Sequence, residues 1–180
     1  MDRGLRLLAD DLAANRGNPR GMLAVAGFRL AQEARRLPRP LAKAVELVYA
    51  LAWLVLLGLE LPPHVEAGPG LRIFHTSGIV VNPAVRLGAN VTLRQNSTLG
   101  GLPGPSGADD AAPVIGDGVD LGASVLVIGP LHIGDGARIG AGAVVTRDVP
   151  AGAVARGNPA RVVEDDPAPD GAPDTPGGLP

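Results

Sequence analysis

Hydrophobic residues recur every six positions between Ile115 and Arg156. The first position of each hexad is aliphatic, and six of the seven are branched: Ile115, Leu121, Val127, Ile133, Ile139, Val145 and Ala151. Gly or Asp crowds the second to fourth positions. A helix would repeat its apolar face every 3.6 residues and a strand every two, so this period fits neither. It predicts a parallel β-solenoid in which three hexads close one triangular coil.

The solenoid pattern extends upstream with two interruptions. Weak hexads begin at Leu61, and the repeat resumes after a two-residue slip near Phe74 and His75, with these first positions: Val81, Leu87, Leu93 and Leu99. Residues 102–113 are rich in Gly, Pro and Asp, so we expect a loop extruded from the solenoid, where binding residues often lie. Each coil buries its aliphatic side chains only against the neighbouring coils, so the stability of the solenoid should come from stacking. We expect the stacked coils to form one domain over residues 60–163.

The N-terminal region, residues 1–59, lacks this period and predicts three short helices: about 1–15, 21–36 and 41–59. The third ends in an apolar run of about 13 residues containing Tyr49 and Trp53, shorter than the roughly 20 residues needed to cross a bilayer. Three arginines precede it: Arg35, Arg36 and Arg39. We expect this helix to be buried against the solenoid or sister subunits. The alternative is peripheral membrane contact, with Trp53 and the arginines at the lipid headgroups.

Composition narrows the functional classes. The chain has 26 Gly, 18 Pro and 46% hydrophobic residues, which suits a turn-rich fold with an aliphatic core. A net charge of −2 gives no electrostatic footprint for nucleic acid, and the absence of cysteine excludes disulfides and thiolate sites. No uninterrupted apolar leader precedes the helices, so we expect a cytoplasmic protein. Residues 164–180 have no period and little apolar content, and we expect a disordered tail.

Several segments carry a resemblance to a known family: HTSGIVV from His75, TLGG ending at Gly101, the IGDGVDLGAS and IGAGAVV hexads, and GNPARVV. Over about residues 58–163 the chain resembles the hexapeptide-repeat acyltransferases of the serine O-acetyltransferase family. The segments LELPP, LRQNSTLGG and VIGDGVDLGA look closer to the short exopolysaccharide and sugar O-acetyltransferases. The resemblance implies a left-handed parallel β-helix, a homotrimer with active sites between subunits, and acetyl transfer from acetyl-CoA to a hydroxyl.

By this resemblance His75 is the general base. An alcohol must lose its proton as it attacks a thioester, and histidine, with an ordinary pKa near 6.5, suits that role. The family pairs this base with an aspartate fifteen residues upstream, where this chain has Glu60, one methylene longer. Such a carboxylate would orient the imidazole. The simpler alternatives are a surface histidine and a glutamate that caps the junction between helix and solenoid.

The resemblance also implies an acetyl-CoA groove in which small residues let the pantetheine arm approach the backbone. The matching small residues are Gly101, Ala123 and Ala141, and the matching basic residues are Arg138, Arg156 and Arg161. The arginines could bind phosphates, and the Gly101 N–H could donate to the tetrahedral oxyanion. Gly and Ala are also ordinary turn residues of every hexad, which is the structural alternative.

The departures from the family concern the acceptor. Phe74 stands where serine enzymes have an acidic residue, and Ala111 and Ala112 replace an Arg–His pair in a loop two residues longer. A serine ammonium and carboxylate would lack ionic partners there, so we expect a sugar or similar neutral hydroxyl compound. Asp109 and Asp110 in the loop could bind it or an amine-bearing acceptor. Serine O-acetyltransferase activity is the alternative.

Two other functional classes use the same solenoid fold. A γ-carbonic anhydrase-like metal protein needs three convergent histidines, and the chain has only these: His64, His75 and His132. We expect no metal site. A non-catalytic solenoid scaffold would not need to retain His75 and Gly101. The short helical region predicts a trimer rather than a hexamer, and a tail without a terminal isoleucine predicts no complex with cysteine synthase.

Overall fold

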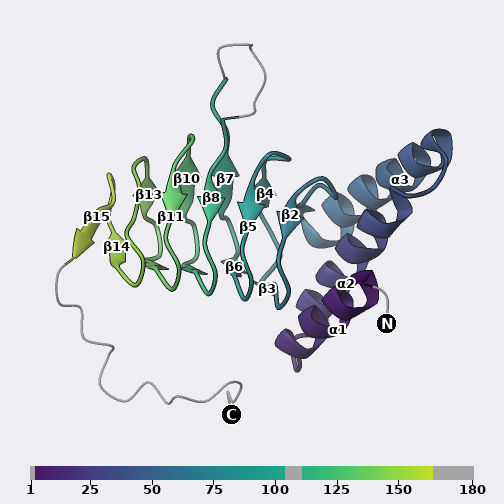
Figure 1. Cartoon of the computed structure of the whole chain (residues 1–180), viewed down its shortest axis with the longest axis horizontal. Helices are drawn as coiled ribbons and strands as arrows, with labels where there is room; N and C mark the ends of the chain where they lie inside the picture. The colour runs from purple at the N-terminus through teal and green to yellow at the C-terminus, as the bar shows by residue number, and fades with distance from the viewer. Residues whose placement is uncertain (1–2, 104–110, 164–180) are drawn as a thin grey trace.

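The computed structural model describes residues 3–103 and 111–163. It is a parallel β-helix with three helices gathered at its N-terminal end (Figure 1), which confirms the predicted mainly-β solenoid with a short helical region. The helices are α1 (Arg3–Ala14), α2 (Pro19–Ala34) and α3 (Arg39–Leu57). Helices α2 and α3 begin two residues before the predicted starts because each takes a proline in its first turn, where the missing N–H costs nothing.

Short strands form three flat sheets, which we call A, B and C. Sheet A contains β1 (Leu59–Glu60), β4 (Ile79–Val81), β7 (Thr98–Gly100), β10 (Leu126–Ile128) and β13 (Val144–Val145). Sheet B contains β2 (Glu66–Ala67), β5 (Arg86–Leu87), β8 (Val114–Ile115) and β11 (His132–Ile133). Sheet C contains β3 (Arg72–Phe74), β6 (Thr92–Arg94), β9 (Asp120–Leu121), β12 (Arg138–Ile139), β14 (Val154–Arg156) and β15 (Arg161–Val163).

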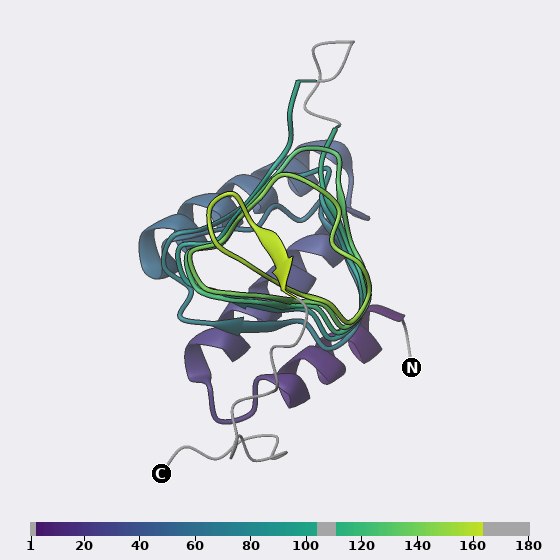
Figure 2. The same cartoon turned by 90° about the vertical axis from the view of Figure 1, so that its left-hand side faces the viewer.

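Viewed along its axis, the solenoid is a triangle (Figure 2). The inward side chains are the aliphatic residues that the hexads predicted, and those of Ile115, Leu121 and Val127 are at most 2% exposed. Each stacks on its counterpart in the next coil, since Val127 pairs with Val145, eighteen residues later. Strand β15 folds back antiparallel to β14 and crosses the C-terminal end of the triangle (Figure 2).

The register between coils departs from eighteen residues at the two places where the sequence predicts interruptions. Arg72 pairs with Thr92, twenty residues later, whereas Val80 pairs with Thr98, eighteen residues later. Two extra residues therefore lie between Phe74 and Val80. The second interruption is the loop that leaves sheet A after β7. Its described ends meet in an isolated antiparallel bridge between Leu102 and Ala111. The predicted contributions of Asp109 and Asp110, and the tail at 164–180, lie outside the described residues.

Helices α1 and α2 cap the open end of sheet C with polar side chains. Asp11 accepts a hydrogen bond from the Leu71 N–H at 3.0 Å, and Asn15 accepts one from the Ile73 N–H at 3.1 Å. The Asn15 amide donates to the Leu71 carbonyl at 2.8 Å, and that of Asn18 donates to the Ile73 carbonyl at 2.8 Å. Strand edges present unpaired backbone groups, and here the helices satisfy them.

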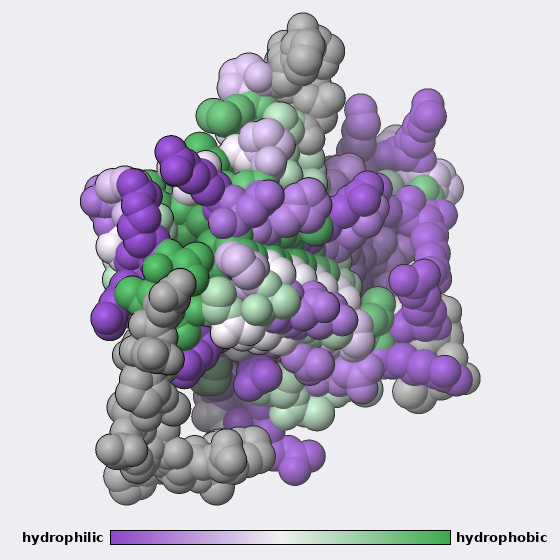
Figure 3. Space-filling view, turned by 60° about the vertical axis from the view of Figure 1, so that its left-hand side comes forward, coloured by the Kyte–Doolittle hydropathy of each residue, from purple (hydrophilic) through white to green (hydrophobic). Residues whose placement is uncertain are grey.

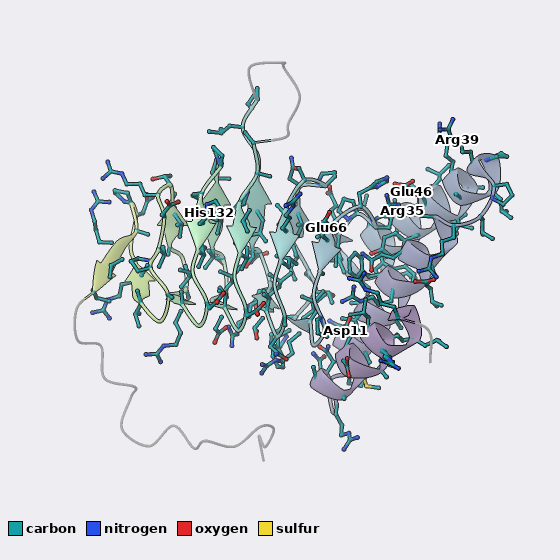
Figure 4. All side chains as sticks on the ribbon, in the orientation of Figure 1. Asp11, Arg35, Arg39, Glu46, Glu66 and His132 are labelled. Carbon is teal, nitrogen blue, oxygen red and sulfur yellow. The ribbon has the colours of Figure 1, made fainter. Side chains whose placement is uncertain are left out.

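The end of sheet B is capped by Arg29. This guanidinium donates to the carbonyls of Ala67 and Gly68 at 3.0 and 2.6 Å and forms an ion pair with Asp11 at 2.8 Å. Both members of the pair are almost fully buried, and Asp11 lies at the junction of helices and solenoid (Figure 4). Burial raises the pKa of Asp11, while Arg29 opposes that rise. The pair thus joins the helical region to the solenoid.

Helix α3 is not buried against the solenoid of its own chain, so that part of our expectation is wrong, whereas burial against sister subunits stays a prediction. Only Tyr49 and Leu57 are buried along its length. The membrane alternative placed Trp53 at the lipid headgroups. That placement is wrong, because the indole packs on α2 and its Nε1–H donates to the Ala24 carbonyl at 3.3 Å. Gly27 makes room for the ring, since a Cβ there would lie 1.8 Å from Trp53 Cζ2. The helix ends at Gly58 in the left-handed conformation.

Candidate active site

The corner between sheets C and A, which we call the C/A corner, collects most of the predicted site residues. Phe74 pairs with Arg94, and the paired strands that follow bring their last residues to the same corner, coil after coil. The residues that turn this corner are therefore, in successive coils, His75, Gln95, Ala123 and Ala141. Backbone hydrogen bonds join them: Ser124 N–H donates to the Gln95 carbonyl at 2.9 Å, and Gly142 N–H to the Ala123 carbonyl at 2.8 Å.

His75 sits on the enlarged first turn of this corner. The two extra residues push the turn outward, and His75 is exposed with φ of 54°, a left-handed conformation that costs a non-glycine residue of the order of 1–3 kcal/mol. The turn is tied down behind it: Thr76 Oγ1 donates to the Leu57 carbonyl at 2.9 Å, and Gly78 N–H donates to the Gly58 carbonyl at 2.8 Å. The imidazole is therefore presented to solvent from a turn anchored to the end of α3.

Glu60 lies in the coil next to the turn that bears His75. It is on β1, directly opposite Val80 of β4. Its side chain is exposed. In residues 3–103 and 111–163, no hydrogen bond or ion pair links Glu60 to His75. Its role as the partner of the base stays a prediction.

Two buried side-chain polar atoms on sheet C and at its C/A corner have no hydrogen-bond partner within the described part of the chain. They are Gln95 Oε1 and Arg72 Nε. Buried polar atoms in native proteins are nearly always hydrogen-bonded, so an exception calls for an explanation such as a ligand or water. Gln95 turns the corner one coil from His75, which makes it a candidate ligand-binding residue that the sequence did not reveal.

A second constellation missed by the sequence surrounds Phe74. The Arg94 guanidinium lies over the Phe74 ring, with Cζ 5.8 Å from the ring centroid. It also forms a bidentate ion pair with Asp120 and donates to the Leu121 carbonyl at 2.9 Å. Arg94 and Asp120 are 26 residues apart and meet only because the loop sets the register between β6 and β9. The only signal of this cluster in the local sequence was Arg94 itself, the charged residue of the segment LRQNSTLGG.

The other predicted residues divide into two groups. Arg138, on β12, is exposed and stands between Asp120 and Val154, and Arg161, on β15, is exposed at the C-terminal end. Both belong to sheet C, which ends at the C/A corner. Gly101 follows β7 and lies at the opposite end of sheet A, so a single chain does not bring it to His75.

No metal-binding cluster is found in the described ranges. No three His, Asp or Glu side chains gather there. His64 pairs with Glu46 at 3.2 Å near the helices, and His132 lies on sheet B, with its backbone N–H bonded to Asp148 Oδ1 at 2.7 Å. Each histidine therefore lies on a different part of the triangle.

One hollow of the described chain lies between the helices and sheet B, away from the C/A corner, and has a volume of about 540 Å³. Its walls include Arg29, Arg35, Glu66 and Arg86, and all four already form ion pairs or hydrogen bonds to backbone carbonyls. Arg35 and Glu66 are labelled in Figure 4. The hollow follows from the fit of the helices to the first coil. It contains neither His75 nor any other predicted site residue.

Comparison with known proteins assigns the family. The six-repeat bacterial transferase hexapeptide family matches residues 112–147. Soybean serine acetyltransferase, as the apoenzyme and complexed with serine, is 36% identical, with a TM-score of 0.78 over 90% of this chain and 70% of that one. The chain belongs to the serine acetyltransferase family. A serine acetyltransferase solved as a complex with CoA is 27% identical, with a TM-score of 0.76 over 89% of this chain and 69% of that one.

Curated relatives agree with this family assignment. Serine acetyltransferase 1, chloroplastic, of Arabidopsis thaliana is 44% identical over 105 residues, which are 58% of this chain and 33% of that protein. The chain thus spans about a third of the length of this relative. The predicted closer likeness to sugar O-acetyltransferases is not supported, because the relatives and structures described here are serine acetyltransferases. The family prediction itself is confirmed.

Proposed function

We propose that this chain is an acetyl-CoA-dependent O-acetyltransferase with His75 as the general base. The observation that carries the proposal is the C/A corner, where an exposed histidine is followed, coil by coil, by small residues. Family membership and the similar structure complexed with CoA support the same chemistry. In the reaction, an imidazole nitrogen takes the proton of the acceptor hydroxyl as its oxygen bonds to the thioester carbon. The C–S bond then breaks, and the proton passes to the departing sulfur.

Acetyl-CoA would lie along the same corner, with its thioester at His75. Coils are about 4.8 Å apart, so Ala123 and Ala141 follow the base at roughly 10 and 14 Å. Side chains larger than alanine at these two positions would fill the path of the pantetheine arm. Arg138 and Arg161 are exposed farther along sheet C, where they could bind phosphates through forked donors.

We also propose a homotrimer. Gly101 and His75 lie at opposite ends of sheet A, so the predicted oxyanion donor reaches the base only from a neighbouring subunit. The outer face of sheet A carries Val80 and Leu126 in one row, 37% and 39% exposed. Hydrophobic residues on the solenoid flank lie between hydrophilic ones (Figure 3), as in an interface core with a polar rim. Light scattering should give a trimer, and a hexamer or co-elution with a cysteine synthase would contradict the proposal.

Two acceptor classes have support. The names of the relatives favour L-serine. The residues beside the base favour a neutral hydroxyl compound such as a sugar. Phe74 offers an apolar ring where the family has an acid, and the nearby Arg94 is already paired with Asp120. A serine ammonium would therefore meet an aromatic ring and a guanidinium instead of a carboxylate. We propose the neutral acceptor.

The deciding experiment follows CoA release with a thiol reagent. L-serine, sugars, nucleotide sugars and amino sugars compete at equal concentration. We expect saturable acetylation of a sugar-type hydroxyl and very slow acetylation of L-serine. The variant Phe74→Asp should shift the preference toward L-serine, and Phe74→Leu, which adds no charge, should not. Efficient turnover of L-serine by the wild-type chain would establish the serine acceptor. Stoichiometric zinc in the purified protein would favour the carbonic anhydrase class instead.

A further inference from the structure

Helix α3 exposes an unusually large apolar surface. Seven of its large aliphatic side chains are 47–79% exposed: Leu41, Leu47, Val48, Leu51, Leu54, Val55 and Leu56. By length and composition α3 could cross a membrane, and only 11% of its apolar window is buried. Exposed apolar surface of this extent usually marks an interaction site.

The opposite face of α3 holds the helix to the rest of the molecule. Tyr49 and Trp53 stack with ring centroids 5.0 Å apart, and the Tyr49 hydroxyl donates to the Leu61 carbonyl at 2.8 Å. Trp53 fills the space above Gly27 of α2. Because one face is committed to these contacts, α3 cannot span a bilayer as a free helix. Only its outer face is available to a partner.

The exposed charged residues of α3 are positive. Arg39 and Lys43 are exposed in the first turns of α3, and Arg39 lies at the tip far from the solenoid (Figure 4). Arg35, four residues before the helix, is also exposed, and its guanidinium donates to the Pro63 carbonyl at 3.1 Å. The one acidic residue of α3 is Glu46, which pairs with His64 on the opposite face. An apolar face with a basic rim matches an interfacial helix.

A second copy of the chain fits this surface less well than a lipid surface does. In a symmetric contact built on the outer face of α3, a residue of one subunit meets a different residue of the other. Arg39 and Lys43 would then meet an outer face that carries aliphatic side chains and offers no exposed carboxylate to pair with them. Anionic headgroups would neutralise these cations while the acyl boundary covers the apolar side chains.

We propose that α3 lies in the interfacial layer of an anionic membrane. Its outer apolar residues, centred on Val48, Leu51 and Val55, enter the boundary between headgroups and acyl chains. Arg39 and Lys43 contact the anionic headgroups, and the solenoid extends away on the aqueous side. This docking does not depend on the acyl-transfer chemistry at His75.

The test is flotation of the full-length chain with phosphatidylcholine vesicles, with and without phosphatidylglycerol. We expect binding to the anionic vesicles that weakens as salt rises. Val48→Glu/Val55→Glu should lose at least about tenfold in vesicle affinity, and Arg39→Gln/Lys43→Gln should lose about fivefold for each charge removed. The control Val162→Glu changes an exposed valine at the other end of the solenoid and should bind like wild type.

Three results would overturn the proposal. The first is a wild-type chain that floats with neither vesicle. The second is a Val48→Glu/Val55→Glu variant that floats like wild type. The third is a change of oligomeric state in that variant, seen by light scattering, which would assign the outer face to contact between subunits. If each variant unfolds at the same temperature as the wild-type chain, its loss of binding is not caused by a loss of folding.

Discussion

Polar side chains meet the solenoid at two places that differ in how completely they are hydrogen-bonded. At the helical end, Asp11 is bonded to Arg29 and to the Leu71 N–H, and Asn15 bonds backbone groups on both sides of the junction. At the C/A corner, His75 is exposed and Gln95 Oε1 is buried without a partner in the described ranges. Both places break the aliphatic repeat, but only the first completes its own hydrogen bonds.

The difference separates stability from function. A satisfied buried network holds two parts of a chain in one arrangement, and removing one member leaves the others buried without partners. An incomplete set of polar groups contributes little to stability and is the form expected for a site that binds another molecule. Variants at the helical end should therefore unfold the protein more easily, while variants at the corner should lose catalysis.

The largest expected effect is on catalysis by His75→Ala. Loss of one well-placed general base should lower turnover roughly 10²–10⁴-fold, while acetyl-CoA affinity and the melting temperature stay near wild type. The measurements are CoA-release kinetics on the accepted substrate, calorimetry with acetyl-CoA, and thermal unfolding. Wild-type turnover by this variant would remove His75 from the mechanism.

Next is the effect of Asp11→Ala on stability. The change leaves the Arg29 guanidinium buried without its carboxylate, which should cost about 3–5 kcal/mol of unfolding free energy. Urea unfolding followed by circular dichroism measures it. The matched control is Asp10→Ala, on the same helix at an exposed position. Equal stability of the two variants would show that the ion pair does not hold the helices to the solenoid.

Asn15→Ala should act in the same direction but more weakly. It leaves the Ile73 N–H and the Leu71 carbonyl each short of one hydrogen bond, a loss of about 1–3 kcal/mol in unfolding free energy. The same urea titration measures this loss. If the variant lost activity without losing stability, Asn15 would belong with the corner residues instead of the cap.

Glu60→Gln should reduce turnover by about tenfold, equal to roughly 1.4 kcal/mol, which is less than for His75→Ala. The change alters the orientation of the base without removing it. In the double variant with His75→Ala, the Glu60 effect should vanish if Glu60 acts only through His75. A Glu60 effect that persists there would indicate an independent role, such as capping the junction.

The smallest expected effect on stability is that of Gln95→Met. It replaces a buried acceptor that has no partner with a side chain of similar size, so unfolding free energy should change by less than about 1 kcal/mol. Affinity for acetyl-CoA or for the acceptor should fall, as read by calorimetry and KM. A strongly destabilised variant would mean that Gln95 is bonded within the folded protein and has no binding role.

The sequence by itself determined the repeating part of the molecule. A six-residue period reports which side chains point inward in each coil, because every hexad meets the same surroundings as its neighbour. It therefore predicted the triangular coils, the slip near His75 and the loop after Gly101. Family motifs added His75 as the candidate base, since HTSGIVV is a contiguous segment.

Only the tertiary structure decided the parts that depend on how segments distant in sequence meet. Asp11 reaches the Leu71 N–H sixty residues later because α1 packs on the open edge of β3. Arg94 reaches Asp120 because the loop fixes the register between β6 and β9. Hydrophobicity alone predicted that α3 would be buried, yet burial depends on what faces a helix, and its outer face meets no other element of the described chain.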